Sequence, residues 1–311
     1  MAEAGDKRYY GHLHEVLESG GFAVTAELPP PRGATLEGFR RTARALKGWV
    51  DAVNVTDGQS ANVRVASWAG SVALLQEGVE PVMQVQCRDR NRIALQSDLL
   101  SAGALHIPNV LVLTGDPPGA GDHPDAKPVF DVDSVGLMRV ANGMMERGEL
   151  MSGRSLPSKP HYLLGAAENP YSPPESNPYD RFNAKIGAGA RFVQTQFVFD
   201  IPGFQRWMDG VLDRGINERC HIIAGVGPIR SRESLAMLSK LPGTNISEAV
   251  VRRLEAAGEA GMAAEGVAIC AEIIAQLKDI KGVAGVHVMA ARLEDFLPDM
   301  LTKAGVAPRT P

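Results

Sequence analysis

The stretch EPVMQVQCRDRNRIALQSDLLSAGALHIPNVLVLTG, residues 80–115, contains a complete strand, helix and strand pattern. Its ends, 80–87 and 109–115, are short runs rich in valine, leucine and methionine, whereas the middle segment, 90–104, places apolar residues at a spacing near 3.6. Two strands joined by a crossover helix run parallel, and mostly unalternating apolar strands are typical of a sheet covered on both faces. The stretch therefore predicts one unit of a parallel α/β fold.

The same unit recurs along the whole chain. Eight apolar runs are predicted to be strands, at residues 22–28, 51–56, 80–87, 109–115, 161–167, 191–197, 221–227 and 285–290. Segments with helical spacing follow them, at residues 36–49, 64–78, 90–104, 134–150, 181–189, 201–215 and 247–280. Eight such strands in 311 residues favour a closed (β/α)8 barrel, the TIM barrel, over an open doubly wound sheet. No linker interrupts the pattern, so residues 1–311 are expected to form a single barrel domain.

Composition limits the partners of this protein. The chain has 32 basic and 36 acidic residues and a formal net charge of −4, so it lacks the excess of positive charge that binds nucleic acids or anionic membranes. No apolar run is expected to be long enough to span a bilayer, and the first residues lack the pattern of a secretion signal. These features predict a cytoplasmic protein that binds a small molecule.

Neither the cysteines nor the acidic clusters indicate a metal centre. Cys87, Cys220 and Cys270 lie far apart without metal-ligand spacing, and they are interpreted as buried free thiols. Asp122, His123 and Asp125 could ligate a metal, but a solvated loop explains them better because their spacing fits no strong metal signature. No metal is therefore expected.

Polar side chains occur at the ends of nearly all predicted strands. They are Glu27, Asp57, Gln84, Gln86, Asp116, Glu168, Gln194, Gln196 and His287. In a barrel of this type the carboxyl ends of the strands and the loops after them form the site, so these side chains are expected to meet at one rim. Carboxylates and carboxamides suit a heterocyclic ligand with donor and acceptor edges. These residues alone leave the reaction open.

Glu27 and Asp116 are the two acids of greatest interest. Glu27 lies inside the apolar run AVTAEL and precedes three prolines at 29–31, so its side chain is expected to point inward with a raised pKa, as a proton donor at neutral pH requires. Asp116 follows a buried strand, and two interpretations stay open for it. Either it faces a ligand at the barrel mouth, or it caps the next helix or forms an Asx turn before Pro117.

Two further residues also have two interpretations each. His287 lies in a central strand, where a core histidine with satisfied hydrogen bonds is favoured over a ligand contact. Lys185 is either an ordinary solvated charge or a contact for a phosphate group.

Six segments carry a resemblance to a known family. They are TAELPPPRG (25–33), VNVTDGQSANVRVAS (53–67), QCRDRNRIALQSDLLSAGALHIPNVLVLTGDPP (86–118), FVQTQFVFD (192–200), AGVGPI (224–229) and GVAGVHVMA (282–290). Taken together, they make the chain similar to the 5,10-methylenetetrahydrofolate reductase family over nearly its whole length. That family has an eight-stranded barrel that binds flavin and folate at the same rim.

The resemblance implies roles for individual residues. Glu27 matches the general acid of the family, Asp116 an aspartate near the flavin and the pterin, Gln196 a pterin-binding glutamine, and Lys185 a lysine near the flavin phosphate. The implied cofactor-binding positions are Thr56, Gln84, Thr114, Gly115, Asp116, Glu168 and Lys185. The implied reaction protonates N10 to open the methylene bridge to an iminium, and a hydride from flavin N5 then produces the methyl group.

The chain departs from the family pattern at positions that contact the flavin. An Arg-Gly-Asp sequence is replaced by Thr114, Gly115 and Asp116, a histidine by Gln84, and a tyrosine and a histidine by Glu168 and Ser172. The resemblance implies FAD, with FMN or direct flavin-free transfer from NADH as alternatives. The Thr-Gly-Asp variant is similar to a branch found in acetogens, in which a partner subunit supplies the electrons. A homo-oligomer is also implied.

Two other classes of protein remain as alternatives. One is a folate-binding barrel that transfers a methyl group to or from a corrinoid protein, which would use the same carboxylates and amides without a flavin. The other is a non-catalytic subunit that has kept the fold. The presence of Glu27 counts against that second class.

Overall fold

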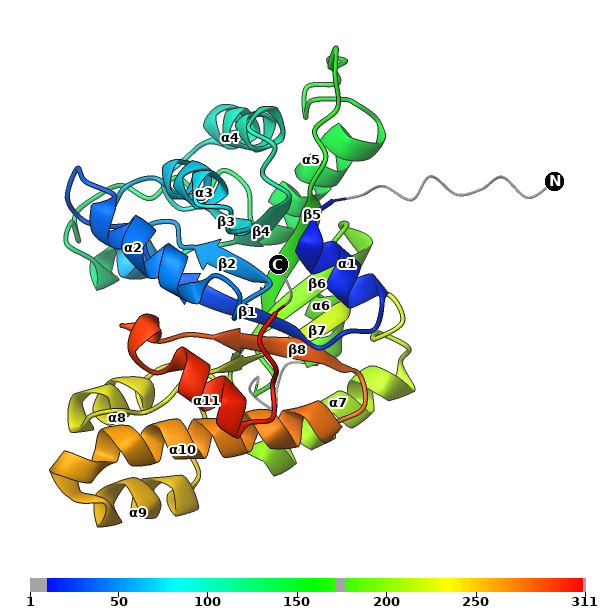
Figure 1. Cartoon of the computed structure of the whole chain (residues 1–311). Helices are drawn as coiled ribbons and strands as arrows, with labels where there is room; N and C mark the ends of the chain where they lie inside the picture. The colour runs from blue at the N-terminus through cyan, green and yellow to red at the C-terminus, as the bar shows by residue number, and fades with distance from the viewer. Residues whose placement is uncertain (1–9, 172–176, 310–311) are drawn as a thin grey trace.

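The computed structural model describes residues 10–171 and 177–309, and Ser172 lies outside this range. Eight parallel strands pair in chain order and close into a barrel (Figure 1). They are β1 (Ala23–Leu28), β2 (Ala52–Val55), β3 (Pro81–Gln86), β4 (Asn109–Leu113), β5 (Leu163–Glu168), β6 (Phe192–Phe197), β7 (His221–Val226) and β8 (Val283–Val288). The first and last strands close the barrel in a register that places Ala23 beside Gly285. The predicted TIM barrel is confirmed.

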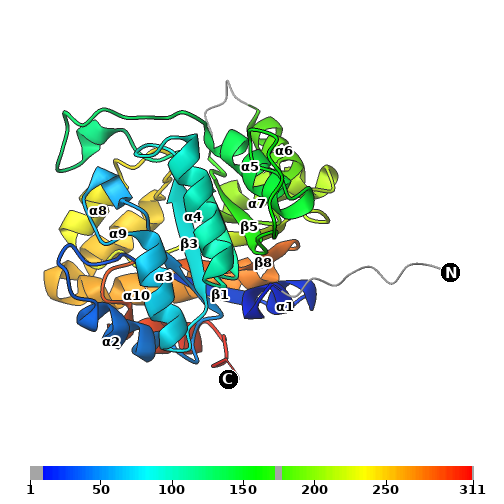
Figure 2. The same ribbon diagram turned by 90° about the horizontal axis from the view of Figure 1, so that it is seen from above.

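Helices surround the barrel, and Figure 2 shows α3, α4 and α5 among those outside the strands. Those that follow strands at predicted positions are α2 (Glu37–Leu46), α3 (Ser67–Gln76), α4 (Arg92–Ala104), α5 (Ser134–Glu146), α6 (Pro178–Gly187) and α7 (Ile201–Asp213). Short 3-10 turns follow β2, β4 and β8, namely η1 (Gln59–Ala61), η2 (Pro118–Ala120) and η3 (Leu293–Asp295). The sequence did not predict α1 (His12–Glu18), α8 (Arg232–Leu238) and α11 (Leu297–Lys303).

The single helix predicted over 247–280 is wrong. The structure has two helices there, α9 (Glu248–Ala256) and α10 (Gly258–Asp279). Gly258 has a φ of 66°, in the left-handed region that glycine adopts without steric cost, and the chain breaks at that residue. α10 is also long and apolar enough to cross a membrane by length and composition, contrary to the expectation that no such run exists. It packs against β7, β8 and α11, as an outer helix of the barrel does.

Helix α1 covers the amino-terminal end of the barrel. Leu13 and Leu17 pack on buried side chains from the starts of the strands. These partners are Ala23, Ala52, Val82, Leu111, Leu163, Phe192 and Ile223. The carboxylate of Glu80 accepts hydrogen bonds from the backbone N–H groups of His12 and Leu13, at 2.6 and 3.0 Å, and so satisfies two free donors at the start of α1. The opposite, carboxyl end of the barrel holds the cavity.

Candidate functional site

A cavity of about 710 Å³ lies at the carboxyl ends of the strands. All the residues predicted for the site line it: Glu27, Thr56, Gln84, Thr114, Gly115, Asp116, Glu168, Lys185 and Gln196. Further polar residues that line it include Asp57, Gln86, Arg88, Gln194 and His287. The structure therefore brings the predicted set together at one rim, while the role of each residue remains a prediction.

Glu27 is a partly buried acid held by two amides. It is the fifth residue of β1, and its Oε1 accepts a hydrogen bond of 2.8 Å from Gln59 Nε2, with Gln84 as a second side-chain donor. Burial raises the pKa of Glu27 to about 7, and the two amide hydrogen bonds oppose that shift. The direction agrees with the prediction from its apolar surroundings. Near neutral pH, this group can therefore hold a proton or release it.

Asp116 lies in the loop after β4, where the chain leaves the barrel wall. It is exposed, and among the residues that the structure describes no side-chain partner binds its carboxylate. Helix α5 is capped by Asp133, which accepts a 2.7 Å hydrogen bond from Gly136 N, so the helix-capping interpretation of Asp116 is wrong. The carboxylate is free to face a ligand in the cavity.

Glu168 and Lys185 form a buried ion pair on the β5 side of the cavity. Lys185 Nζ lies 2.8 Å from Glu168 Oε2 and also donates to Ala167 O at 2.5 Å. Glu168 Oε1 accepts from Asn169 N at 3.0 Å, so both carboxylate oxygens have a partner. Lys185 is 6% exposed, and the interpretation of it as a solvated charge is wrong. A phosphate group at Lys185 would share that cation with Glu168.

A chain of hydrogen bonds forms the floor of the cavity inside the barrel. The amides of Asn54 and Gln194 bond to each other at 2.5 and 3.0 Å, and Gln194 Nε2 also lies 3.1 Å from Thr25 Oγ1. Thr25 Oγ1 is 2.9 Å from His287 Nδ1. Burial lowers the pKa of His287 to about 3, so this ring is neutral at pH 7. His287 is a core histidine, as favoured above, with an edge on the cavity.

Thr56 and Gln196 are two further polar residues that line the cavity. Thr56 is 1% exposed, and its Oγ1 has no hydrogen-bond partner within the described part of the chain. A buried hydroxyl without a partner costs free energy, so this position is suited to a polar atom of a ligand. Gln196 Oε1 accepts from Phe197 N at 3.0 Å, and this contact fixes the orientation of its amide.

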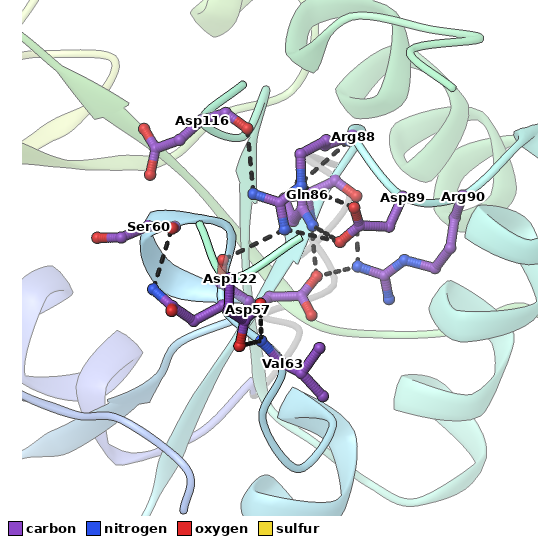
Figure 3. A network of polar contacts seen from close by, with 11 residues as sticks. Asp57, Ser60, Val63, Gln86, Arg88, Asp89, Arg90, Asp116 and Asp122 are labelled. Atoms are coloured by element: carbon purple, nitrogen blue, oxygen red, sulfur yellow. Dashed lines mark hydrogen bonds and ion pairs between the residues drawn. The ribbon is translucent and has the colours of Figure 1, made fainter. Parts of the chain in front are cut away.

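Charged groups from the loops after β2, β3 and β4 form a network at the rim (Figure 3). The guanidinium of Arg88 binds the carboxylate of Asp89 and two backbone carbonyls, and Arg90 pairs with Asp57 and Asp98. Burial raises the pKa of Asp57, against the opposing effect of Arg90. Asp122 accepts from Val63 N at 3.1 and 3.2 Å, which places it in a loop contact.

Sequence reasoning missed three residues that shape this site. Gln59, Arg88 and Asn54 act through partners that lie far away in the chain, at separations of 28 to 140 residues. Asn54 offered a signal, because a polar residue stands inside the apolar strand AVNV. Gln59 and Arg88 lie among other polar residues, where nothing in the local pattern distinguishes them.

Comparisons with known proteins place the chain among its relatives. The family model for methylenetetrahydrofolate reductase matches residues 12–305. The chain is 24% identical over 317 aligned positions to a probable methylenetetrahydrofolate reductase (NADPH) of Caenorhabditis elegans, which covers 96% of this chain and 45% of that protein. It is also 24% identical over 240 positions to methylenetetrahydrofolate reductase 2 of Schizosaccharomyces pombe, covering 72% of this chain and 35% of that protein. The chain thus spans less than half the length of these relatives.

The fold is similar to that of a solved structure. It is an uncharacterized protein from Clostridium thermocellum, described as binding two copies of 5-methyl-5,6,7,8-tetrahydrofolic acid. The two structures superpose with a TM-score of 0.65, and the match covers 94% of this chain and 97% of that one. At 12% sequence identity, the likeness concerns the fold alone.

Proposed function

Because the chain belongs to the methylenetetrahydrofolate reductase family, we propose that it reduces 5,10-methylenetetrahydrofolate to 5-methyltetrahydrofolate, with Glu27 as the general acid. The observation that supports this most directly is the raised pKa of Glu27 in a cavity that Asp116 and Gln196 also line. General acids work best when their pKa lies near the working pH, and a pKa of about 7 meets that condition.

Glu27 is proposed to deliver its proton to the folate. Gln59 donates to Oε1 of the carboxyl group, and the protonated carboxyl group carries the acidic proton as an O–H donor. Transfer of this proton to N10 of the folate breaks the bond between N10 and the methylene carbon and leaves an iminium at N5. A hydride then adds to the iminium carbon. The product keeps the proton on N10 and the hydride in its new methyl group, and Glu27 regains a proton from water.

Asp116 and Gln196 are proposed to act on the substrate. The Asp116 carboxylate is proposed to stabilise the positive charge of the iminium, because it lines the cavity and makes no hydrogen bond or ion pair within the described part of the chain. Gln196, whose amide is oriented by the backbone of Phe197, is proposed to bind the donor and acceptor edge of the pterin.

The cavity offers suitable contacts for the ring of a flavin. The unpartnered Thr56 hydroxyl is a buried polar atom that a ligand would satisfy, and Gln84, Thr114 and Gly115 line the same wall. We propose that these residues, with Asp116, would hold FAD. A reduced flavin supplies the hydride when it is bound. Lys185 would contact a flavin phosphate while it stays paired with Glu168, and the Glu168 carboxylate would oppose that contact by like-charge repulsion.

The proposal takes NADH as the electron donor, and anaerobic spectroscopy of the purified protein tests it. Protein incubated with FAD should show a flavin spectrum that bleaches with NADH and returns when methylenetetrahydrofolate is added, with 5-methyltetrahydrofolate found by mass spectrometry. A colourless protein that still oxidises NADH with methylenetetrahydrofolate would identify flavin-free transfer. A flavoprotein that ignores NADH but reacts after chemical reduction would point to a partner subunit as the donor, as in the acetogen-like branch.

The same assay separates reduction from methyl transfer. A folate barrel that serves a corrinoid protein would bind 5-methyltetrahydrofolate and would not consume a reductant. Failure of the wild-type protein to form 5-methyltetrahydrofolate with NADH or with a chemically reduced flavin would contradict the proposed function.

A further inference from the structure

Three loops at the rim carry the groups that the proposed reaction uses. The loop after β2 leads to Gln59, which bonds to Glu27, and the loop after β4 carries Asp116. Between them in the barrel is the loop after β3, which begins with Cys87 and Arg88. The position of Asp116 relative to Gln59, the partner of Glu27, therefore depends on what holds the outer two loops to the middle one.

The Arg88 side chain makes that connection. Arg88 is 4% exposed, and its Nη2 donates to the carbonyl oxygen of Gly58 at 3.2 Å while its Nη1 donates to the carbonyl oxygen of Asp116 at 3.1 Å. Figure 3 shows that Asp116 meets Arg88 through its backbone and turns its carboxylate away. The contact thus fixes the position of Asp116 and leaves its carboxylate available to the cavity.

The charge of Arg88 is neutralised by its neighbour. Nε and Nη2 lie 2.7 and 2.8 Å from the two carboxylate oxygens of Asp89, a bidentate contact. The Gln86 side chain also donates to the Asp89 carboxylate and accepts from the backbone N–H of Arg88 at 3.0 Å. It therefore helps to fix both partners of the ion pair. Arg88 therefore serves mainly to hold neighbouring groups of the rim in place, and its positive charge is largely offset by Asp89.

The two outer loops approach this guanidinium closely. A Cβ atom at Gly58 would lie 2.7 Å from Arg88 Nη2, and one at Gly115 would lie 2.1 Å from Gln86 Oε1 and 3.1 Å from Arg88 Cβ. Both glycines have positive φ angles, 55° and 94°. The loop after β2 can reach Arg88 Nη2, and the loop after β4 can pack on Gln86 and on Cβ of Arg88, only because these two positions carry no side chain.

We propose that Arg88 is a positioning residue for this reaction, which sets the relative position of Asp116 and of the Gln59 and Glu27 pair by binding the carbonyls of Asp116 and Gly58. This role rests on the proposed function. Only a planar fork with separate donors can hold two carbonyls and a carboxylate at once, and a lysine ammonium cannot reproduce that arrangement. Displacement of a reacting group by about 1 Å costs on the order of 100-fold in rate.

The test is a double-mutant cycle with kinetic readouts. Arg88→Lys should lower kcat by about 10- to 100-fold, with a change of less than about threefold in the Kd of 5-methyltetrahydrofolate. Asp116→Asn should then cost much less in the Arg88→Lys background than in the wild type, because the carboxylate is already misplaced. Gln196→Ala, on β6 and without contact to Arg88, should cost the same in both backgrounds.

Arg40→Gln is the control, because it removes an arginine that also bonds to a carboxylate and a carbonyl but lies away from the cavity. Arg40 donates to Glu77 at 2.9 Å and to Ala73 O at 3.4 Å on the outer helices, so its loss should lower Tm without lowering kcat. Independence of the Arg88→Lys and Asp116→Asn effects would overturn the positioning role while the proposed function stands. Absence of turnover in the wild type would instead overturn the proposed function and this role with it.

Hydrogen exchange tests whether Arg88 holds the loops after β2 and β4, and it requires no turnover. Arg88→Lys should increase exchange at the amides of Ala61 and Gly121, which bond within the loops after β2 and β4, relative to wild type and to Arg40→Gln. Unchanged exchange in both loops would show that Arg88 does not hold them, and would refute the positioning role on its own.

Discussion

Gln59 Nε2, from the loop after β2, donates a hydrogen bond of 2.8 Å to Glu27 Oε1 on the neighbouring strand β1. Such a bond favours the charged carboxylate and so lowers the pKa of Glu27, against the larger effect of burial. The balance leaves the pKa at about 7, a value at which a carboxyl group can act as an acid in neutral solution. One amide thus both orients the acid and limits how strongly it holds its proton.

The pH dependence of kcat follows from this pair. Glu27 must be protonated to act, so kcat should fall as pH rises through about 7, approaching tenfold per pH unit. In Gln59→Ala one bond to the charged form is lost, so the alkaline limb should move to higher pH while the maximum rate falls. The measurement is a pH profile of single-turnover folate reduction. A limb that moves to lower pH would contradict the assigned effect of Gln59.

Removal of the acid tests the role of Glu27 directly. Glu27→Gln keeps the shape of the side chain and should lower folate reduction by about 100-fold or more, the usual contribution of a general acid. Reduction of the bound flavin by NADH should stay nearly unchanged, since that step does not involve N10. Stopped-flow spectroscopy separates the two half-reactions. Folate turnover within about tenfold of the wild type would show that the role is wrongly assigned.

Stability should also respond to this residue. The folded state binds a proton at Glu27 more tightly than the unfolded chain, so this group makes the protein less stable as pH rises from about 4.5 to about 7. Glu27→Gln should therefore raise stability at pH 8 by about 1 to 3 kcal/mol and have little effect at pH 4. Thermal unfolding at both pH values measures the difference. An equal shift at the two values would mean that the carboxyl is not perturbed.

Asp116→Asn should weaken catalysis less than loss of the acid. The variant loses a negative charge next to the proposed iminium but keeps a polar group at the same place, so a decrease in kcat of about 10- to 100-fold is expected. The free energy of unfolding should be unchanged within about 0.5 kcal/mol, because the carboxylate is exposed and caps no helix. Unchanged folate kinetics would exclude an electrostatic role for Asp116.

The ion pair of Glu168 and Lys185 gives a prediction for cofactor binding. Glu168→Gln removes the carboxylate that a flavin phosphate would have to approach, so FMN should bind about tenfold more tightly. Riboflavin, which has no phosphate, should bind with unchanged affinity and serves as the control. Quenching of flavin fluorescence measures both. Equal changes for FMN and riboflavin would show that Lys185 does not contact the phosphate.

The sequence was sufficient to predict the barrel and the rim. Strands of a closed parallel sheet are buried on both sides, so their residues are mostly apolar. Runs such as NVLVL and HIIAGV have this composition. Polar residues at the carboxyl ends of those runs must meet once the barrel closes, which is why Glu27, Asp116 and Gln196 were found together.

Local pattern could not predict the interactions between loops. Arg88 lies in CRDRN, where each of three charged side chains could equally well face the solvent. Its role depends on the carbonyls of Gly58 and Asp116, which carry no sequence signal because every residue has a carbonyl. Likewise, the ion pair of Glu168 and Lys185 arises because β5 and α6 are neighbours in space, which strand and helix patterns do not specify in side-chain detail.

Helix α1, whose backbone N–H groups bond to Glu80, affects how small molecules reach the cavity. Within the described residues, α1 covers the amino-terminal end of the barrel with buried side chains, and the cavity lies at the carboxyl ends of the strands. In the proposed reaction, the folate and the reductant would both enter from the carboxyl ends of the strands and bind in the same cavity. Release of the product would therefore have to precede binding of the next ligand at the same place in the cavity.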